Sequence, residues 1–180
     1  MKHHYIEESP FSYFFTADTR TAPLWFLVRV YLGWQWLEAG WGKFNNPAWF
    51  GPDAGSAIFG FGQGALVKTG GAHPDVQWWY ADFLQQTLIA HPYFWSHLIT
   101  LGELAVGLGL IAGCLTGIAA FFGVFMNLNF LLSGSVSANP IMFTLGIGLI
   151  LAWRVSGYWG IDRYILPLLH GYLRPPVRER

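Results

Sequence analysis

The sequence has 180 residues, of which 11% are charged and 53% are hydrophobic. Soluble domains carry about 25% charged residues, and a chain of this length cannot bury nearly all of its surface, so the composition argues against a soluble globular protein. Basic residues are too sparse for a nucleic-acid surface, and a single cysteine excludes an internal disulfide. We therefore predict an integral membrane protein whose residues 1–180 form one all-α domain.

The first predicted membrane span covers residues 24–44. Pro23 precedes it, at a position where a missing N–H is harmless. The span has the roughly 20 residues that a helix needs to cross a bilayer. It also carries Arg29, Glu38 and Lys43, which an ordinary lipid-facing helix would not contain.

The next segment, residues 45–93, is too aromatic for disorder and too long for a simple connection. Glycines alternate there with Phe50, Phe59 and Phe61, and residues 75–90 have helical spacing. We predict that this segment forms an extracytoplasmic cap that lies on the membrane or dips into it.

Residues 98–132 form one apolar run that would be about 52 Å long as a single helix. That length is too great for one crossing, and Gly113 and Gly117 flank a break within it. We therefore predict two spans, at 94–112 and 117–132, joined by a tight turn.

The fourth predicted span covers residues 140–158, with Asn139 as its cap and Pro140 at its first position. The four spans together predict a four-helix bundle. Residues 161–173 are amphipathic and predict a helix on the membrane surface. The basic, proline-rich tail at 174–180 is predicted to be disordered.

Basic residues are distributed unequally between the two sides of this arrangement. The side of the membrane without the termini holds only Lys68 and, at a helix end, Lys43. The positive-inside rule therefore predicts a multi-pass plasma-membrane protein with both termini in the cytoplasm. The basic residues on the side of the termini are Lys2, Arg20, Arg154, Arg163, Arg174, Arg178 and Arg180.

Charged side chains inside a span are costly and are therefore candidates for function. Glu38 and Glu103 fall at similar depth in the outer half, near Lys43, so we predict these three residues as catalytic. A quinone needs an apolar groove, hydrogen-bond donors at its carbonyls and a proton relay. No metal or flavin motif is evident. The residues predicted to bind the quinone are Arg29, Trp36, His97, Asn127 and Asn129.

Each of these residues also has a structural interpretation. Arg29 and Glu103 would then form ion pairs that fix helix register, and the two asparagines would form hydrogen bonds between helices. Lys43 would only extend to the outer surface, Glu38 would only neutralise it, and the tryptophans would be interfacial anchors.

Four stretches resemble the DoxX/DoxD family in the right order. They are "LVRVYLGWQWLEAGWGKFNNPAW", "GELAVGLGLIAG", "NLNFLLSGSVSANP" and "GYWGIDRYILP". The long segment with "WWYADFL" is similar to the DoxD-like branch. The resemblance covers residues 22–169, and the positions that match its motifs are Arg29, Gly33, Gly40, Lys43, Glu103, Asn127 and Asp162.

The resemblance implies the large membrane subunit of a thiosulfate dehydrogenase (quinone). Such a subunit lies in membrane lipid beside a small extracytoplasmic DoxA-like subunit, and electrons pass from thiosulfate to quinone. Alternatives from other classes are a non-catalytic scaffold that docks redox-stress proteins and a small-solute carrier. Homo-oligomer formation stays open.

Overall fold

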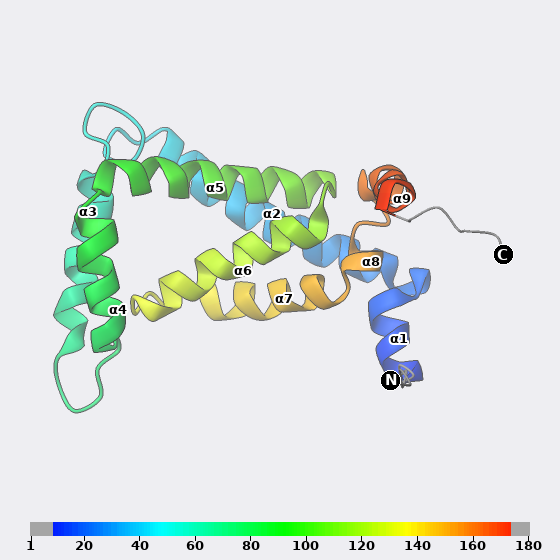
Figure 1. The fold of residues 1–180 in the computed structure, drawn as a ribbon, viewed down its shortest axis with the longest axis horizontal. Helices are drawn as coiled ribbons and strands as arrows, with labels where there is room; N and C mark the ends of the chain where they lie inside the picture. Colours follow the sequence, from blue (N-terminus) through cyan, green and yellow to red (C-terminus); the bar gives the residue numbers. More distant parts are fainter. Residues whose placement is uncertain (1–8, 174–180) are drawn as a thin grey trace.

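The computed structural model describes residues 9–173, and all regular elements in that range are helical, which confirms the predicted all-α class. Four long helices lie roughly along the longest axis of the molecule (Figure 1). A layer of shorter helices crosses one end of them, and further short helices lie at the other end. The long helices are α2 (Ala22–Phe44), α5 (Pro92–Ala112), α6 (Thr116–Leu132) and α7 (Asn139–Leu151).

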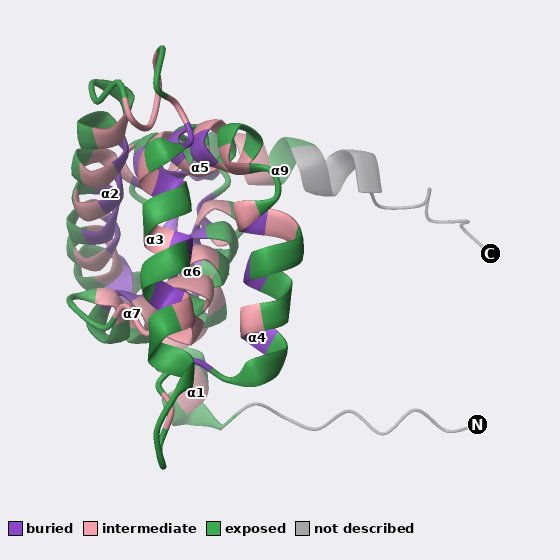
Figure 2. Cartoon of the chain, turned by 90° about the vertical axis from the view of Figure 1, so that its left-hand side faces the viewer, coloured by how far each residue is buried: buried purple, intermediate pink, exposed green. Residues whose placement is uncertain are grey.

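The main hydrophobic core lies between the long helices. Helix α2 packs on α5 and α7, and α6 packs on the same two helices, so each long helix has two neighbours. Buried residues face inward on these helices while their outer faces stay exposed (Figure 2). The core residues are Leu32, Trp36, Val106, Leu110, Ala120, Met142 and Leu149.

The first three predicted spans agree with helices to within two residues at each end. The predicted break between the second and third spans is also present. Gly113 has φ of 65° and Leu115 has φ of 50°, so the chain reverses through two left-handed residues. Glycine adopts this conformation without the strain that a side chain brings.

The predicted fourth span is too long. Helix α7 ends at Leu151, and Ala152 leaves helical geometry with φ of −91° and ψ of 22°. A short helix, α8 (Trp153–Ser156), follows, and Val155 packs with Ala152 and Ala22 at the start of α2. This small second core turns the chain back and stops the helix before residue 158.

The prediction for the start of that span is also wrong in detail. Asn139 is the first helical residue and Ala138 occupies the cap position. The Asn139 side chain donates a hydrogen bond to the main-chain oxygen of Ser135 at 2.9 Å, which ties the preceding turn to the helix.

The segment between α2 and α5 folds as a transverse helical layer (Figure 1). It consists of α3 (Ser56–Leu66), η2 (Val67–Thr69), α4 (Trp78–Phe83) and η3 (Leu84–Ile89), which is a π-helix. The layer has its own core against the ends of α5 and α6. The buried residues of that core are Ile58, Ala65, Val76, Tyr80, Leu84 and Leu88.

The opposite end carries α1 (Pro10–Ala17), η1 (Thr19–Thr21) and α9 (Asp162–Leu173). Helix α9 agrees with the predicted helix at 161–173. Phe11 and Tyr13 of α1 project outward, with exposed fractions of 75% and 54%. The tail predicted to be disordered, 174–180, lies outside the described residues.

Within residues 9–173, α5 is the helix that is both long enough and apolar enough to cross a membrane, and α6 and α7 are apolar but shorter. Only 33% of the most apolar stretch of α5 is buried. The core helix of a soluble protein is mostly buried, and α5 is not.

Glycines let α2 and α5 approach closely. A Cβ atom added at Gly107 would lie 2.6 Å from the Leu37 nitrogen, and one added at Gly40 would lie 2.8 Å from the Leu104 nitrogen. Both distances are shorter than real contacts, so the two helices pack backbone against backbone at these points.

We predict that Gly107→Ala destabilises the protein by about 1–3 kcal/mol, because the added methyl group forces α2 and α5 apart. The matched control is Gly42→Ala on α2, where an added Cβ meets nothing within 4 Å. The control is expected to be neutral or stabilising by about 0.5–1 kcal/mol, since alanine favours helix. Thermal unfolding in detergent measures both, and equal midpoints for the two variants would contradict the close-contact argument.

Candidate functional site

Lys43 and Glu103 form an ion pair between α2 and α5. The Lys43 Nζ lies 2.9 Å from Oε1 and 2.7 Å from Oε2 of Glu103. The Glu103 side chain is 1% exposed, whereas the Lys43 side chain is 20% exposed. The pair therefore joins a buried carboxylate to a lysine whose side chain is partly exposed.

The segment after α2 covers this pair. The Lys43 Nζ lies 5.1 Å from the centre of the Trp49 ring, within range of a cation–π contact. Ser96 of α5 donates a hydrogen bond to the Trp49 main-chain oxygen at 2.6 Å, which fixes the loop on α5. Thr100 continues this buried polar row by donating to the Ser96 oxygen at 2.8 Å.

Arg29 lies toward the other end of α2 and does not approach this pair. Its guanidinium donates to the main-chain oxygens of Leu110 at 2.6 Å, Ile111 at 3.1 Å and Trp159 at 3.1 Å. These first two oxygens lie in the last turn of α5, where the Leu110 oxygen also accepts from the Gly113 nitrogen at 3.3 Å. Arg29 therefore caps α5 and joins it to the segment before α9.

Asp162 fixes the other end of the α5–α6 turn, at the start of α6. Its carboxylate accepts hydrogen bonds from the main-chain nitrogens of Leu115 at 2.6 Å and Thr116 at 2.8 Å, where α6 begins. Asp162 is 2% exposed. The "GID" of the closing motif was the sequence signal for this residue, although the motif did not reveal its partner.

Glu38 lies apart from Glu103. It is exposed on the outward face of α2, between the exposed Trp34 and Trp41. Among the described residues, Lys43 forms its ion pair with Glu103 and not with Glu38. The shared site for both carboxylates that the sequence suggested is therefore not formed in this structure.

The remaining predicted quinone residues are dispersed. Trp36 lies in the main core and stacks on Phe130, with ring centres 6.5 Å apart. His97 packs between Phe50 and Tyr93, at 4.6 and 4.4 Å between ring centres. None of these contacts joins Trp36 or His97 to the Lys43–Glu103 pair.

The two asparagines of α6 have different surroundings. Asn127 is completely buried, and neither its amide nitrogen nor its oxygen has a hydrogen-bond partner within the protein. Asn129 reaches the cap, where its main-chain oxygen and its Oδ1 atom each lie 3.0 Å from the hydroxyl of Tyr80.

Tyr80 is a residue that the site prediction missed, because the sequence placed it only on one face of a helix. It is buried in the cap core. Burial raises the pKa of Tyr80 to about 12, so the phenol stays protonated and serves as a hydrogen-bond donor at neutral pH. Within the described residues there is no group of three or more His, Cys, Asp and Glu that could hold a metal ion.

Comparison with known proteins gives one family. The family model described as "TQO small subunit DoxD" matches residues 24–172. That description names a small subunit, which differs from the large-subunit role that the sequence resemblance implied. Neither a curated protein nor a solved structure matches the chain.

We predict that Lys43→Met destabilises the protein by about 3–5 kcal/mol, because the buried Glu103 carboxylate loses its cation. The double variant Lys43→Met/Glu103→Leu is expected to recover most of that loss, since it removes both charges together. Thermal unfolding in detergent measures both variants. Glu103→Leu alone completes the cycle, and strictly additive losses from the two substitutions would show that the pair is not coupled.

Proposed function

The chain belongs to the DoxD family, and we propose from this premise that it is a membrane subunit of a thiosulfate:quinone oxidoreductase. In this reaction two thiosulfate dianions join through a new sulfur–sulfur bond to give tetrathionate and release two electrons. Those electrons and two protons reduce one quinone to quinol. The family match over most of the chain supports this assignment, and the small-subunit description is the one we adopt.

In this proposal α2, α5, α6 and α7 cross the membrane as a four-helix bundle, with both termini in the cytoplasm. The transverse layer of α3 and α4 then lies outside as the cap. Large apolar side chains on the outward faces of the long helices support contact with lipid. They include Leu101, Leu108, Phe121, Phe125 and Ile141.

The observation that carries the proposal is the partly exposed Lys43 side chain at the cap end of α2. A cation near the outer surface attracts a dianion and raises its local concentration. Glu103 holds that ammonium in place from below. As a buried carboxylate next to this cation, Glu103 is our candidate for relaying protons.

The proposed partner is an extracytoplasmic DoxA-like subunit that docks on the cap. Val67 and Trp78 of the cap are exposed by 83% and 75%. Large apolar side chains this exposed on the cap support its use as an interface. The partner supplies the electron-transfer groups that this chain itself does not display as a motif.

We predict that Lys43→Met raises the KM for thiosulfate by at least about tenfold, since the local cation is lost. Lys43→Arg keeps the charge and is expected to retain most of the affinity. The assay measures thiosulfate-dependent quinone reduction in membranes that contain the co-expressed extracytoplasmic subunit. Arg163→Gln, which removes an exposed cation at the opposite end, is the matched control and should leave KM unchanged.

Glu103→Gln is expected to lower kcat, with Asp82→Asn as the matched control for loss of an exposed carboxylate. Normal rates and KM values in both Lys43→Met and Glu103→Gln, at normal protein levels, would reject this site. Absence of thiosulfate-dependent activity in the wild type, with the partner present, would reject the enzymatic function and favour a scaffold.

A further inference from the structure

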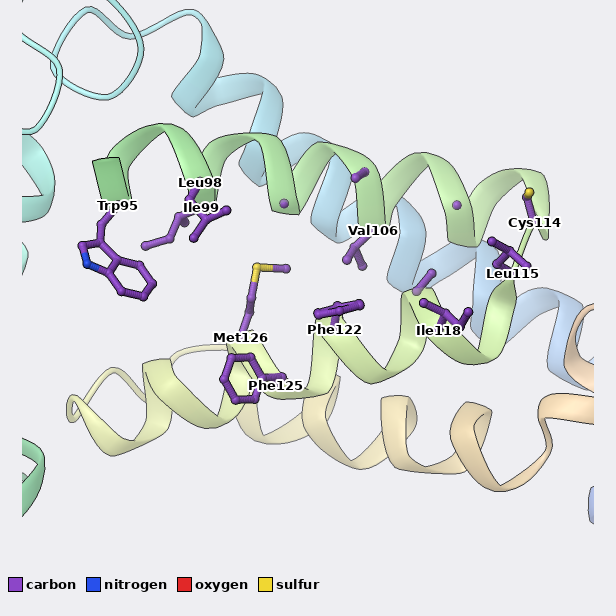
Figure 3. A pocket seen from close by; sticks show the side chains of 14 residues that line it. Trp95, Leu98, Ile99, Val106, Cys114, Leu115, Ile118, Phe122, Phe125 and Met126 are labelled. Atoms are coloured by element: carbon purple, nitrogen blue, oxygen red, sulfur yellow. The ribbon is translucent and has the colours of Figure 1, made fainter. Parts of the chain in front are cut away.

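A long apolar groove runs between α5 and α6 on the outside of the helix bundle (Figure 3). Its volume is about 490 Å³, which lies within the range of small-molecule sites. Its walls come from both helices, and the side chains that line it are apolar along its whole length. They include Leu98, Ile99, Ile118, Phe122, Phe125 and Met126.

The groove is a wedge. Helices α5 and α6 join at Cys114 and Leu115 and separate toward Trp95, where Met126 projects from α6 toward α5 (Figure 3). From Trp95 to Cys114 the wedge is about 28 Å long, since a helix rises 1.5 Å per residue. Gly102, Ala105 and Gly109 have little or no side chain and so leave room for a ligand on the α5 side. It therefore suits a slender chain that lies parallel to the helices.

A smaller cavity of about 100 Å³ lies at the wide end of the groove, under the cap. Trp95, Ile99, Phe125 and Met126 line both cavities, so the two lie next to each other. Six of the eleven residues around the smaller cavity are aromatic, which suits a flat ring. The aromatic residues are Phe61, Tyr80, Phe83, Trp95, Phe125 and Phe130.

The lining of this cavity includes the hydroxyl-bearing Tyr80 of the cap and the amide-bearing Asn129 of α6. Their side chains already form a hydrogen bond, and the Asn129 amide donates to the Phe125 oxygen at 2.8 Å. A carbonyl or hydroxyl group on a ring can join such a network as acceptor or donor. The Tyr80 hydroxyl donates its one hydrogen to Asn129, so it accepts from a ring hydroxyl as it stands and donates to a ring carbonyl once it turns away from Asn129.

The charge of the lining distinguishes a phospholipid from an amphiphile whose head is a neutral ring. A phospholipid head group carries a phosphate, which binds Arg, Lys or helix N-termini. Neither cavity is lined by Lys, Arg or His among the described residues. The wide end therefore favours a neutral ring over a phosphate, and the narrow end favours a long apolar tail.

We infer that a prenylated quinone binds here, with its ring beneath the cap beside Tyr80 and Asn129 and its tail along the α5–α6 groove. The redox role of that quinone rests on the function proposed above, but its binding does not. This site lies on a different face of α5 from Glu103, which packs against Gly40 of α2. Of the residues that the sequence suggested for quinone binding, Asn129 is the one that lines it.

The test is photolabelling of the purified full-length chain with an azido-quinone that carries a prenyl tail, in detergent without thiosulfate or partner. Peptide mapping is expected to find the label on α4, α5 or α6 near Tyr80, Trp95 or Met126. An excess of unlabelled tailed quinone should abolish labelling, and an equal excess of phosphatidylglycerol should not.

Two variants separate the tail from the ring. Gly102→Leu fills the groove, where an added Cβ meets only the Met126 sulfur at 3.5 Å. It is expected to weaken binding of the tailed quinone by about tenfold or more and to leave a tail-less quinone such as duroquinone unaffected. Tyr80→Phe is expected to weaken both quinones equally, by about threefold to tenfold.

Gly42→Leu on α2 is the matched control for the groove and Tyr31→Phe is the matched control for the hydroxyl. Neither is expected to change labelling. If Gly102→Leu does not fold, Ala105→Leu fills the same groove from an exposed position. Labelling elsewhere in the chain, equal competition by phosphatidylglycerol, or full affinity in a folded groove variant would overturn the inference.

The test also distinguishes this inference from the proposed function. Correct labelling in a chain that shows no thiosulfate-dependent activity with its partner would reject the oxidoreductase assignment and keep the quinone site. Full activity with labelling outside the groove would keep the oxidoreductase assignment and reject the site.

Discussion

The close contact between α2 and α5 is the constraint on which the remaining structure depends. Gly40 and Gly107 let the two backbones approach within the space that a methyl group would occupy. At that distance a lysine at one end of α2 reaches a carboxylate on α5, and an arginine at the other end reaches the last carbonyls of α5. The same contact thus places Lys43 on Glu103 and Arg29 on Leu110.

This contact also determines which surfaces are left for ligands. Lys43 and Arg29 of α2 are bonded to α5, whereas the face of α5 toward α6 carries no charged side chain in the groove. One helix therefore has an ionic face and an apolar face. In our proposal a dianion approaches the first from the aqueous side and a quinone enters the second from the bilayer. The two substrates then never compete for one pocket.

Much of this arrangement could be predicted from the sequence, and the rest depended on contacts between distant segments. Helical length, Gly113 and the charges on α2 were sufficient to predict the first three long helices. The partner of Arg29 could not be found, because carbonyl oxygens have no sequence signal. Tyr80 was missed for a similar reason, since its contact with Asn129 depends on how the cap folds over α6. The sequence predicted similar depths for Glu38 and Glu103, but depth alone does not give the direction of a side chain around its helix.

The Arg29 and Asp162 contacts explain why the groove is narrow at the α5–α6 turn and wide at the cap. Arg29 holds the end of α5 and Asp162 holds the start of α6, so the turn between these helices is fixed on both sides. The helices can then separate only toward the cap, where Tyr80 and the aromatic residues of α3 and α4 close the wide end. A ligand with one bulky end therefore has one orientation that fits. The ring lies toward the cap, at the end where the protein offers a hydroxyl and an amide.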